Sequence, residues 1–307
     1  MRPFAASTLI LFAVTTQAFA AETTLDRTDR FAAPNGQLGA GITFTGEPKG
    51  RAYAELAFTR EAQSVDELGG TFEEHVNGLN LLLGGAYRVL PALEIEAMLP
   101  IAWAQYGGSA SFGGQSQSRS DGGFAVLNLH LGVNYLRAER PWRLKVGGAL
   151  EWGPWTNNFG LTARTAVLAT NAAYGGEHLG LWAPEAFSIV APARFEYGER
   201  LVVSGDAQLG LHVSTSGGDS ELSIQLAPGV GYYATDVVLV GLRLPFTWIP
   251  TESGSYSTFF AIEPYGRFDL GSIFLDTSFV LNIDEPYGFA FDSGRFWALH
   301  FGGGASF

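Results

Sequence analysis

Residues 127–135 are LNLHLGVNY, and every second residue of this stretch is apolar. The apolar positions are Leu127, Leu129, Leu131, Val133 and Tyr135. The positions between them hold asparagine, histidine and glycine. A period of two over this length predicts a β-strand with one apolar face and one polar or small face.

The same alternation recurs along the chain, in residues 142–152, 203–213, 238–248 and 297–307. These segments are as long as the ~9–11 residues that cross a bilayer at a tilt, whereas strands of globular proteins average ~5–6. Aromatic residues gather near the segment ends, as an interfacial girdle requires: Tyr87, Trp103, Tyr106, Tyr135, Trp142, Trp152, Tyr197, Tyr232 and Trp248. A soluble β-sandwich also shows alternation. The length of the strands and the aromatic girdle favour a membrane protein over the sandwich. The predicted fold is all-β, a transmembrane antiparallel up-and-down β-barrel, because a closed barrel pairs every backbone group in lipid.

Short and long connections alternate between the predicted strands. The short ones lie near 88–92, 137–141, 198–200, 234–236 and 269–272, and the long ones at about 107–122, 153–184, 215–220, 250–256 and 284–293. Outer-membrane barrels carry short periplasmic turns and long extracellular loops, which sets the orientation. Eleven strands follow residue 76, and residues 51–60 form a twelfth. An acidic outer loop follows this strand and holds Glu61, Asp66, Glu67, Glu73 and Glu74. Fourteen is the alternative, because 37–45 resembles a further strand and 159–170 is a candidate for another.

The first residues indicate export. Met1-Arg2, an apolar core over 4–14 and Ala18-Phe19-Ala20 predict a signal peptide, residues 1–20, cleaved after Ala20. Residues 21–36 are then an N-terminal tether, and residues 37–307 form the barrel domain. The net charge of −12 gives no reason to expect nucleic acid as a partner. The absence of cysteine excludes disulfides, cysteine-ligated metals and thiol catalysis.

Three segments carry a family resemblance. The chain ends in RFWALHFGGGASF (295–307). Phe307 falls on the lipid-facing parity, that is, on the set of every second residue that includes the apolar positions of its strand. In this ending the chain resembles bacterial outer-membrane β-barrel proteins. The resemblance implies a place in the Gram-negative outer membrane, with its lipids and lipopolysaccharide as partners and the barrel-assembly machinery recognising the Phe307 segment. LPALEIEAMLP (90–100) and ATDVVLVGLRLPF (234–246) are similar to hairpin segments of barrels linked to uptake of aromatic or hydrophobic compounds.

The polar parity holds the candidate functional residues. The predicted lumen-lining set is Glu94, Glu96, His130, Arg143, Lys145, Arg194, Glu196, Asp206, His212, Arg243, Glu263, Arg267, Asp269 and Asp276. Charges of both signs in a narrow bore are expected to pair, since a lone ion there is costly. They line a selective polar pore or form a structural ion network, and with Glu55 and Glu151 the acids outnumber the bases, which predicts weak cation preference.

The outer loops and the histidines complete the functional prediction. Loop 153–184, which includes the aromatic Trp182, is long enough to fold inward or to cap the mouth. His130, His212 and His300 lie on the polar parity, away from the lipid where a barrel phospholipase needs its Ser–His pair. We expect no catalytic residue, cofactor or metal. The predicted function is a passive channel or uptake porin for small solutes; the alternatives are a filled structural or adhesive barrel and, less favoured, a barrel hydrolase.

Overall fold

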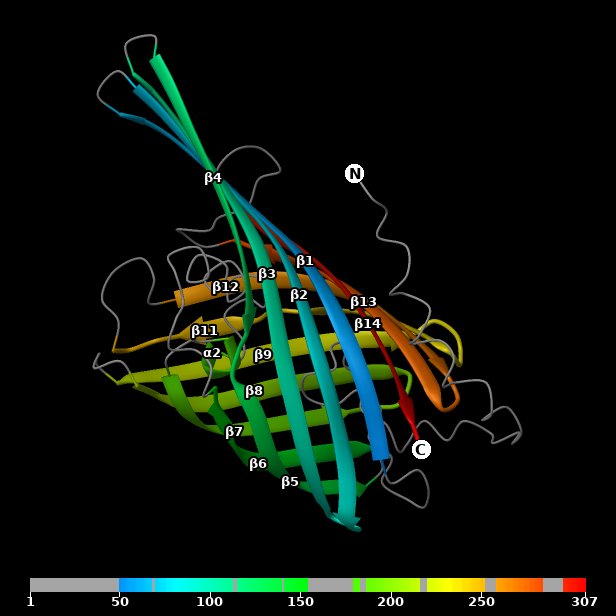
Figure 1. The fold of residues 1–307 in the computed structure, drawn as a ribbon. Helices are drawn as coiled ribbons and strands as arrows, with labels where there is room; N and C mark the ends of the chain where they lie inside the picture. The colour runs from blue at the N-terminus through cyan, green and yellow to red at the C-terminus, as the bar shows by residue number, and fades with distance from the viewer. Residues whose placement is uncertain are drawn as a thin grey trace, which may run out of the picture.

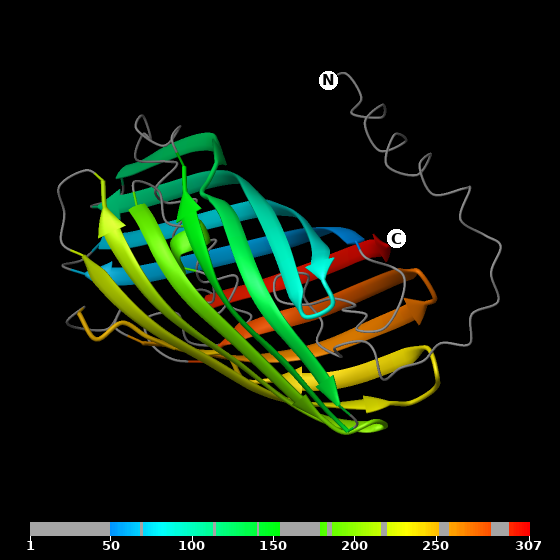
Figure 2. The same ribbon diagram turned by 90° about the horizontal axis from the view of Figure 1, so that it is seen from below.

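The computed structural model describes residues 50–67, 70–112, 115–139, 141–153, 179–182, 186–215, 220–251, 258–283 and 295–307. The predicted signal peptide, the tether and the candidate strands at 37–45 and 159–170 lie outside these ranges. Within them, the chain forms antiparallel strands and one short helix, and these strands wrap into a barrel (Figures 1 and 2). Among the described residues, no helix is long and apolar enough to cross a membrane.

The described strands are as follows: β1 (Gly50–Glu67), β2 (Gly70–Leu90), β3 (Leu93–Phe112), β4 (Gln115–Val126), β5 (Leu129–Glu139), β6 (Trp142–Trp152), β7 (Ala186–Tyr197), β8 (Leu201–Ser214), β9 (Glu221–Tyr233), β10 (Val238–Arg243), β11 (Phe246–Trp248), β12 (Thr258–Leu270), β13 (Ile273–Asn282) and β14 (Arg295–Ser306). The short helix α2 spans Leu179–Trp182. β4 and β5 both pair with β3, and β10 and β11 both pair with β9 and β12, so each couple is one interrupted strand. The fourteen segments therefore form twelve strands, which confirms the predicted number.

The barrel closes where its first strand meets its last. β1 pairs with β14 from Arg51↔Ser306 to Ala62↔Arg295. The backbone N–H of Gly50 donates to the carbonyl of Phe307 at 2.8 Å, and that of Phe307 donates to Gly50 at 2.8 Å. A Cβ on residue 50 would overlap the Phe307 ring, so glycine leaves room for that ring. The seam therefore ends at the side of the barrel that carries the short turns.

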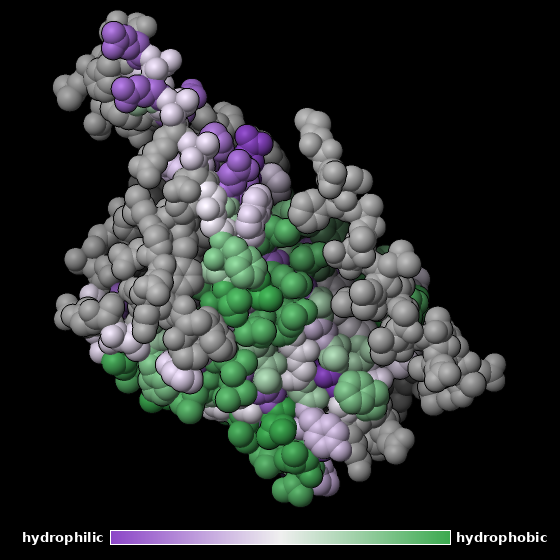
Figure 3. All heavy atoms as spheres, viewed as in Figure 1, coloured by the Kyte–Doolittle hydropathy of each residue, from purple (hydrophilic) through white to green (hydrophobic). Residues whose placement is uncertain are grey.

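The two faces of the strands differ as the alternation predicts. On β5, Leu131, Val133 and Tyr135 are exposed, whereas His130 and Asn134 are buried. The outward apolar side chains form a band around the wall, visible over β1–β3 and the strands beside them in Figure 3. An apolar band outside and a polar interior are the arrangement of a transmembrane barrel.

Leu127 is the exception, because the alternation places it on the lipid face and the structure places it inside, fully buried. The cause is the interruption between β4 and β5. Leu127 donates its N–H to the carbonyl of Pro100, but Asn128 donates its N–H to the carbonyl of Leu181 in α2, at 3.2 Å. Asn128 thus leaves the strand ladder to bind the helix, and Leu127 turns inward with it.

Two predicted outer loops are wrong. The acidic segment after residue 60 and residues 107–122 are not loops: β1 to β4 continue as paired strands, up to Glu67↔Gly70 and Phe112↔Gln115. They form a four-stranded sheet that projects beyond the barrel (Figure 1). Four successive residues of β4, 115–118, are exposed, so both faces of this strand meet water. A strand without an apolar face shows no period-two hydrophobic pattern, so it cannot be recognised as a strand from the sequence in this way.

Candidate functional site in the barrel interior

All fourteen predicted interior residues are buried, with exposed fractions of 7% or less. Most lie toward the end of the barrel with the short turns, as expected. A lumen filled with water would expose such side chains. In this structure, all of them except His212 lie in three groups of neighbouring charged side chains.

The first group joins β1, β3 and β6. Lys145 Nζ lies 2.7 Å from Glu96 Oε2 and 3.3 Å from Glu94 Oε1. Arg51 binds the same two carboxylates, with Nη2 at 3.0 Å from Glu94 Oε1 and 3.6 Å from Glu96 Oε2. Two cations and two anions therefore compensate each other without solvent, which is what buried charge requires.

A histidine extends this group toward the middle of the barrel. His130 Nε2 lies 3.3 Å from Glu96 Oε1, and its Nδ1 lies 3.0 Å from Glu151 Oε1. The ring therefore bridges two carboxylates. The result is a continuous polar chain from Lys145 through Glu96 and His130 to Glu151.

The second group crosses β6, β7, β8, β10 and β12. Its ion pairs are Arg243–Glu263 at 2.6 Å, Arg243–Asp206 at 3.1 Å, Arg194–Glu196 at 2.9 Å, Arg194–Asp206 at 3.5 Å and Arg143–Glu196 at 3.7 Å. Each arginine in this group has a carboxylate partner. The group therefore lies along the part of the barrel wall that runs from β6 to β12.

The third group lies along β1, β12, β13 and β14. Arg267 Nε binds Asp269 Oδ1 at 2.9 Å, and His300 Nδ1 lies 2.9 Å from Glu55 Oε1. Asp276 and Glu55 both stand opposite Gly302, on its two neighbouring strands. Among the described residues, no group of histidines and carboxylates is arranged to hold a metal ion.

His212 lies apart from these ion pairs. Its Nδ1 is 2.8 Å from Ser188 Oγ, and its Nε2 is 2.8 Å from Ser223 Oγ. In a hydrolytic triad, one ring nitrogen holds the nucleophile and the other a carboxylate. Here both nitrogens meet hydroxyls, and His212 is buried. The arrangement is that of a hydrogen-bonded interior histidine.

Arg51 is the interior charge that the sequence reasoning missed. It lies at the start of β1, on the same parity as Glu55. Extending the parity to the first residue of that strand is the signal that finds it. With Arg51, the buried set contains nine acids and six Lys or Arg residues.

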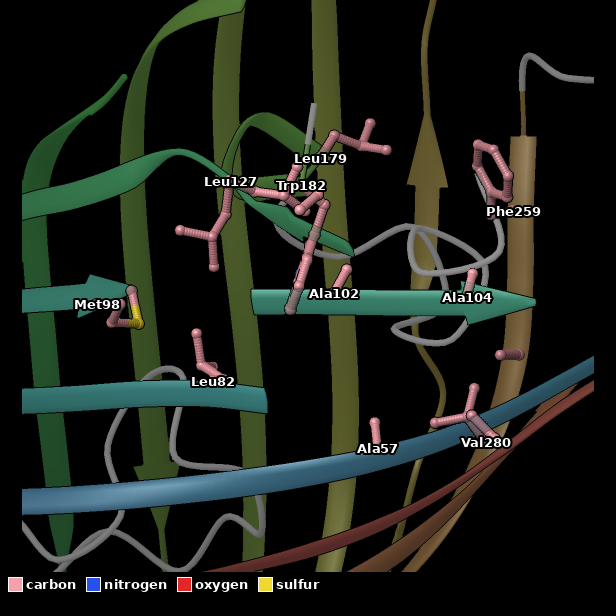
Figure 4. Close-up of a cluster of buried hydrophobic side chains, with 14 of the residues drawn as sticks. Ala57, Leu82, Met98, Ala102, Ala104, Leu127, Leu179, Trp182, Phe259 and Val280 are labelled. Carbon is pink, nitrogen blue, oxygen red and sulfur yellow. The ribbon is translucent and has the colours of Figure 1, made fainter. Parts of the chain in front are cut away.

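Above the charged groups, toward the long connections, the interior holds a cluster of apolar side chains beside the buried polar residues Asn80, Thr247 and Asn282. The cluster includes Ala57, Leu82, Met98, Ala102, Ala104, Leu127, Leu179, Trp182, Phe259 and Val280 (Figure 4). Its members come from strands on opposite sides of the bore and from α2. The charged groups thus lie toward the short turns, and most of the apolar cluster lies toward the long connections, in what is called the apolar level below.

Helix α2 belongs to this apolar level. Residues 179–182 are part of the predicted loop 153–184, and they lie inside the barrel, where α2 contacts β6, β7 and β8. Asn128 Nδ2 donates to the carbonyl of Gly180 at 2.7 Å and to that of Ala186 at 3.0 Å. Trp182, predicted as a loop aromatic, is fully buried. Neither Asn128 nor α2 was among the predicted site residues, because nothing in a four-residue segment of the loop marks where it docks.

Comparison with known proteins gives a fold. An outer membrane channel of Pseudomonas putida F1 superposes with a TM-score of 0.54 at 12% identity, covering 90% of this chain and 100% of that one. The fold is that of bacterial outer-membrane β-barrel proteins. Two others are similar at lower scores: the CymD monoaromatic hydrocarbon channel (TM-score 0.45, 9% identity, 86% and 90% covered) and the translocator domain of the autotransporter NalP from Neisseria meningitidis (0.41, 9%, 85% and 90%). No family model and no curated protein matches the sequence.

Proposed function

We propose that this protein is an outer-membrane channel for the passive uptake of small solutes, exported by its signal peptide and closed in the structure described above. One observation carries the proposal: a four-residue helix is inserted into the bore. An eight-stranded barrel is just filled by the side chains of its own wall, and twelve strands enclose a wider interior. An element inserted into such a bore is a candidate gate.

The division of the interior supports small apolar solutes as the favoured cargo. The level toward the long connections is lined by apolar side chains such as Leu82, Met98 and Leu127. A solute entering from that side meets this surface before the charged level. Apolar surface with few polar groups is typical of sites that take small organic ligands.

A filled structural barrel is the second candidate, and the ion pairs favour it. Each Lys or Arg of the predicted interior set has a carboxylate within 4 Å. Such a network is also what a permanently closed interior would contain. The two functions differ in whether any solute crosses.

Uptake into intact cells separates them. N-Phenyl-1-naphthylamine is an apolar dye that lipopolysaccharide retards and that fluoresces once it reaches lipid. Gram-negative cells that express the protein should take up the dye severalfold faster than cells that do not. Equal rates at equal amounts of folded barrel in the outer membrane would refute the channel and favour the structural barrel.

A further inference from the structure

The seat of α2 in the bore has two distinct parts. One is the apolar cluster, which receives Leu179, Leu181 and Trp182. The other is polar and lies under Gly180, where a Cβ would overlap both Glu151 Oε2 and Ser188 Oγ. Glycine is therefore the residue that lets the helix backbone rest directly on these two side chains.

The polar part of the seat is the upper end of the charged network. Glu151 uses Oε1 to bind His130, which binds Glu96 in turn. Its second oxygen, Oε2, makes no hydrogen bond to a described residue. A buried carboxylate oxygen without a partner is destabilising, and water would relieve that cost.

Asn128 holds α2 against this seat. Two of its hydrogen bonds reach α2, from its side-chain amide to the carbonyl of Gly180 and from its backbone N–H to the carbonyl of Leu181, and a third, also from the side-chain amide, reaches the carbonyl of Ala186 at the start of β7. All three lie at the interruption between β4 and β5. At this point the strand is interrupted, and the backbone N–H of Asn128 binds α2 instead of the neighbouring strand.

These contacts act on the free energy of seating in opposite directions. Leaving the seat exposes apolar side chains, which is unfavourable, but it also hydrates Glu151 and Ser188, which is favourable. A helix on a wholly apolar seat would lack the second contribution. A few hydrogen bonds from one residue can therefore decide which state is populated.

We propose that α2 is the plug of the channel and that Asn128 is the positioning residue that keeps it seated, an inference that rests on the proposed function. With α2 seated, the apolar level is closed above the charged groups. With α2 displaced, the bore opens onto Glu151 and the network below it. Gly180 permits the seat, and Asn128 sets how often it is occupied.

Two substitutions unseat α2 by independent routes. Asn128→Asp keeps the size of the side chain but removes both side-chain donors and places a carboxylate against two carbonyls. Gly180→Ala raises helix propensity, yet its Cβ collides with Glu151 and Ser188. The matched controls are Asn77→Asp, on an exposed residue of β2, and Gly205→Ala, whose Cβ would meet nothing within 4 Å.

Two measurements follow the plug. The chain has no cysteine, so Leu181→Cys introduces a single thiol on α2 in every protein compared. Its rate of labelling by a charged, membrane-impermeant maleimide reports exposure of α2, and planar-bilayer recordings report opening. Losing the side-chain hydrogen bond to Gly180 should raise both labelling rate and open probability by roughly tenfold, whereas both controls should stay within about twofold of the parent.

The outcomes separate the two proposals. If Asn128→Asp and Gly180→Ala are folded, shown by altered gel migration of unheated samples, and change neither readout, α2 is not the plug; dye uptake by the unmodified protein would still support the channel. Faster labelling without added current also overturns the plug. If no variant conducts and the unmodified protein takes up no dye, the proposed function itself fails. Should Asn128→Asp not fold, Gly180→Ala decides alone.

Discussion

Replacing Lys145 with methionine tests the buried ion network at its most connected cation. Lys145 is 1% exposed and lies within 3.3 Å of two carboxylates, Glu94 and Glu96. Methionine fills a similar volume without charge. Arg51 remains beside both acids, so part of the compensation survives. Removing one partner of a buried ion pair costs about 3–5 kcal/mol, and with Arg51 in place we expect about 3 kcal/mol.

Equilibrium unfolding in lipid vesicles measures this loss. Denaturant titrations followed by tryptophan fluorescence, with seven tryptophans in the chain, give the free energy of unfolding for each variant. A loss of about 3 kcal/mol lowers the folding equilibrium constant by roughly a hundredfold. Adding Glu96→Gln to Lys145→Met removes one of the uncompensated acids and should restore part of the stability.

The control is an ion pair between a basic residue and a glutamate whose side chains are exposed instead of buried. Arg137 and Glu139 pair at the short-turn end of β5 with side chains 53% and 51% exposed. Arg137→Met should leave the unfolding transition nearly unchanged, because exposed pairs contribute little. If Lys145→Met is as mild as Arg137→Met, the charges near Lys145 are hydrated and the network does not close the bore.

Three further predictions concern the barrel wall, the seam between β1 and β14, and the signal peptide. Val133→Arg, which places a charge on the exposed apolar face of β5, should cost about 2–4 kcal/mol in the same titration, whereas Ser116→Arg on the projecting end of β4 should cost almost nothing; equal costs would mean that the two faces are assigned wrongly. Deleting Phe307 removes two backbone hydrogen bonds with Gly50 and should slow the appearance of folded barrel in pulse-labelled cells, and unchanged kinetics would argue against this seam as an assembly signal. N-terminal sequencing of the membrane-extracted protein should begin at Ala21; a retained residue 1 would exclude cleavage.

Much of the wall is predictable from the sequence because membrane strands obey one local rule. Apolar and polar residues alternate wherever one face meets lipid and the other the interior, so parity alone finds buried charges such as Lys145 and Arg243. The rule is silent where both faces meet water, and the paired ends of β1 to β4 were therefore predicted as loops. It fails at Leu127, because a long-range hydrogen bond from Asn128 to α2 overrides the local pattern.

The sequence predicts that the interior charges pair, but not which acid pairs with which base. Burial in a narrow bore requires that opposite charges meet, and that expectation needs no structure. Which acid meets which base depends on the register between strands far apart in the sequence, such as Arg51 on β1 with Glu94 on β3. The seat of α2 was not predictable for the same reason, since it is formed by Glu151, Ser188 and Asn128 from three separate segments.

Ion selectivity in planar bilayers tests most directly whether solutes pass through this interior. The buried set holds nine acids and six Lys or Arg residues, so current through the bore should prefer cations weakly, and the preference should fade as salt rises. Replacing Glu94 and Glu96 with glutamine should reduce that preference in the fraction of the protein that folds, as shown by gel migration of unheated samples. If neither the unmodified protein nor the folded, inserted Asn128→Asp and Gly180→Ala variants carry current, or if the current prefers anions, the account is contradicted.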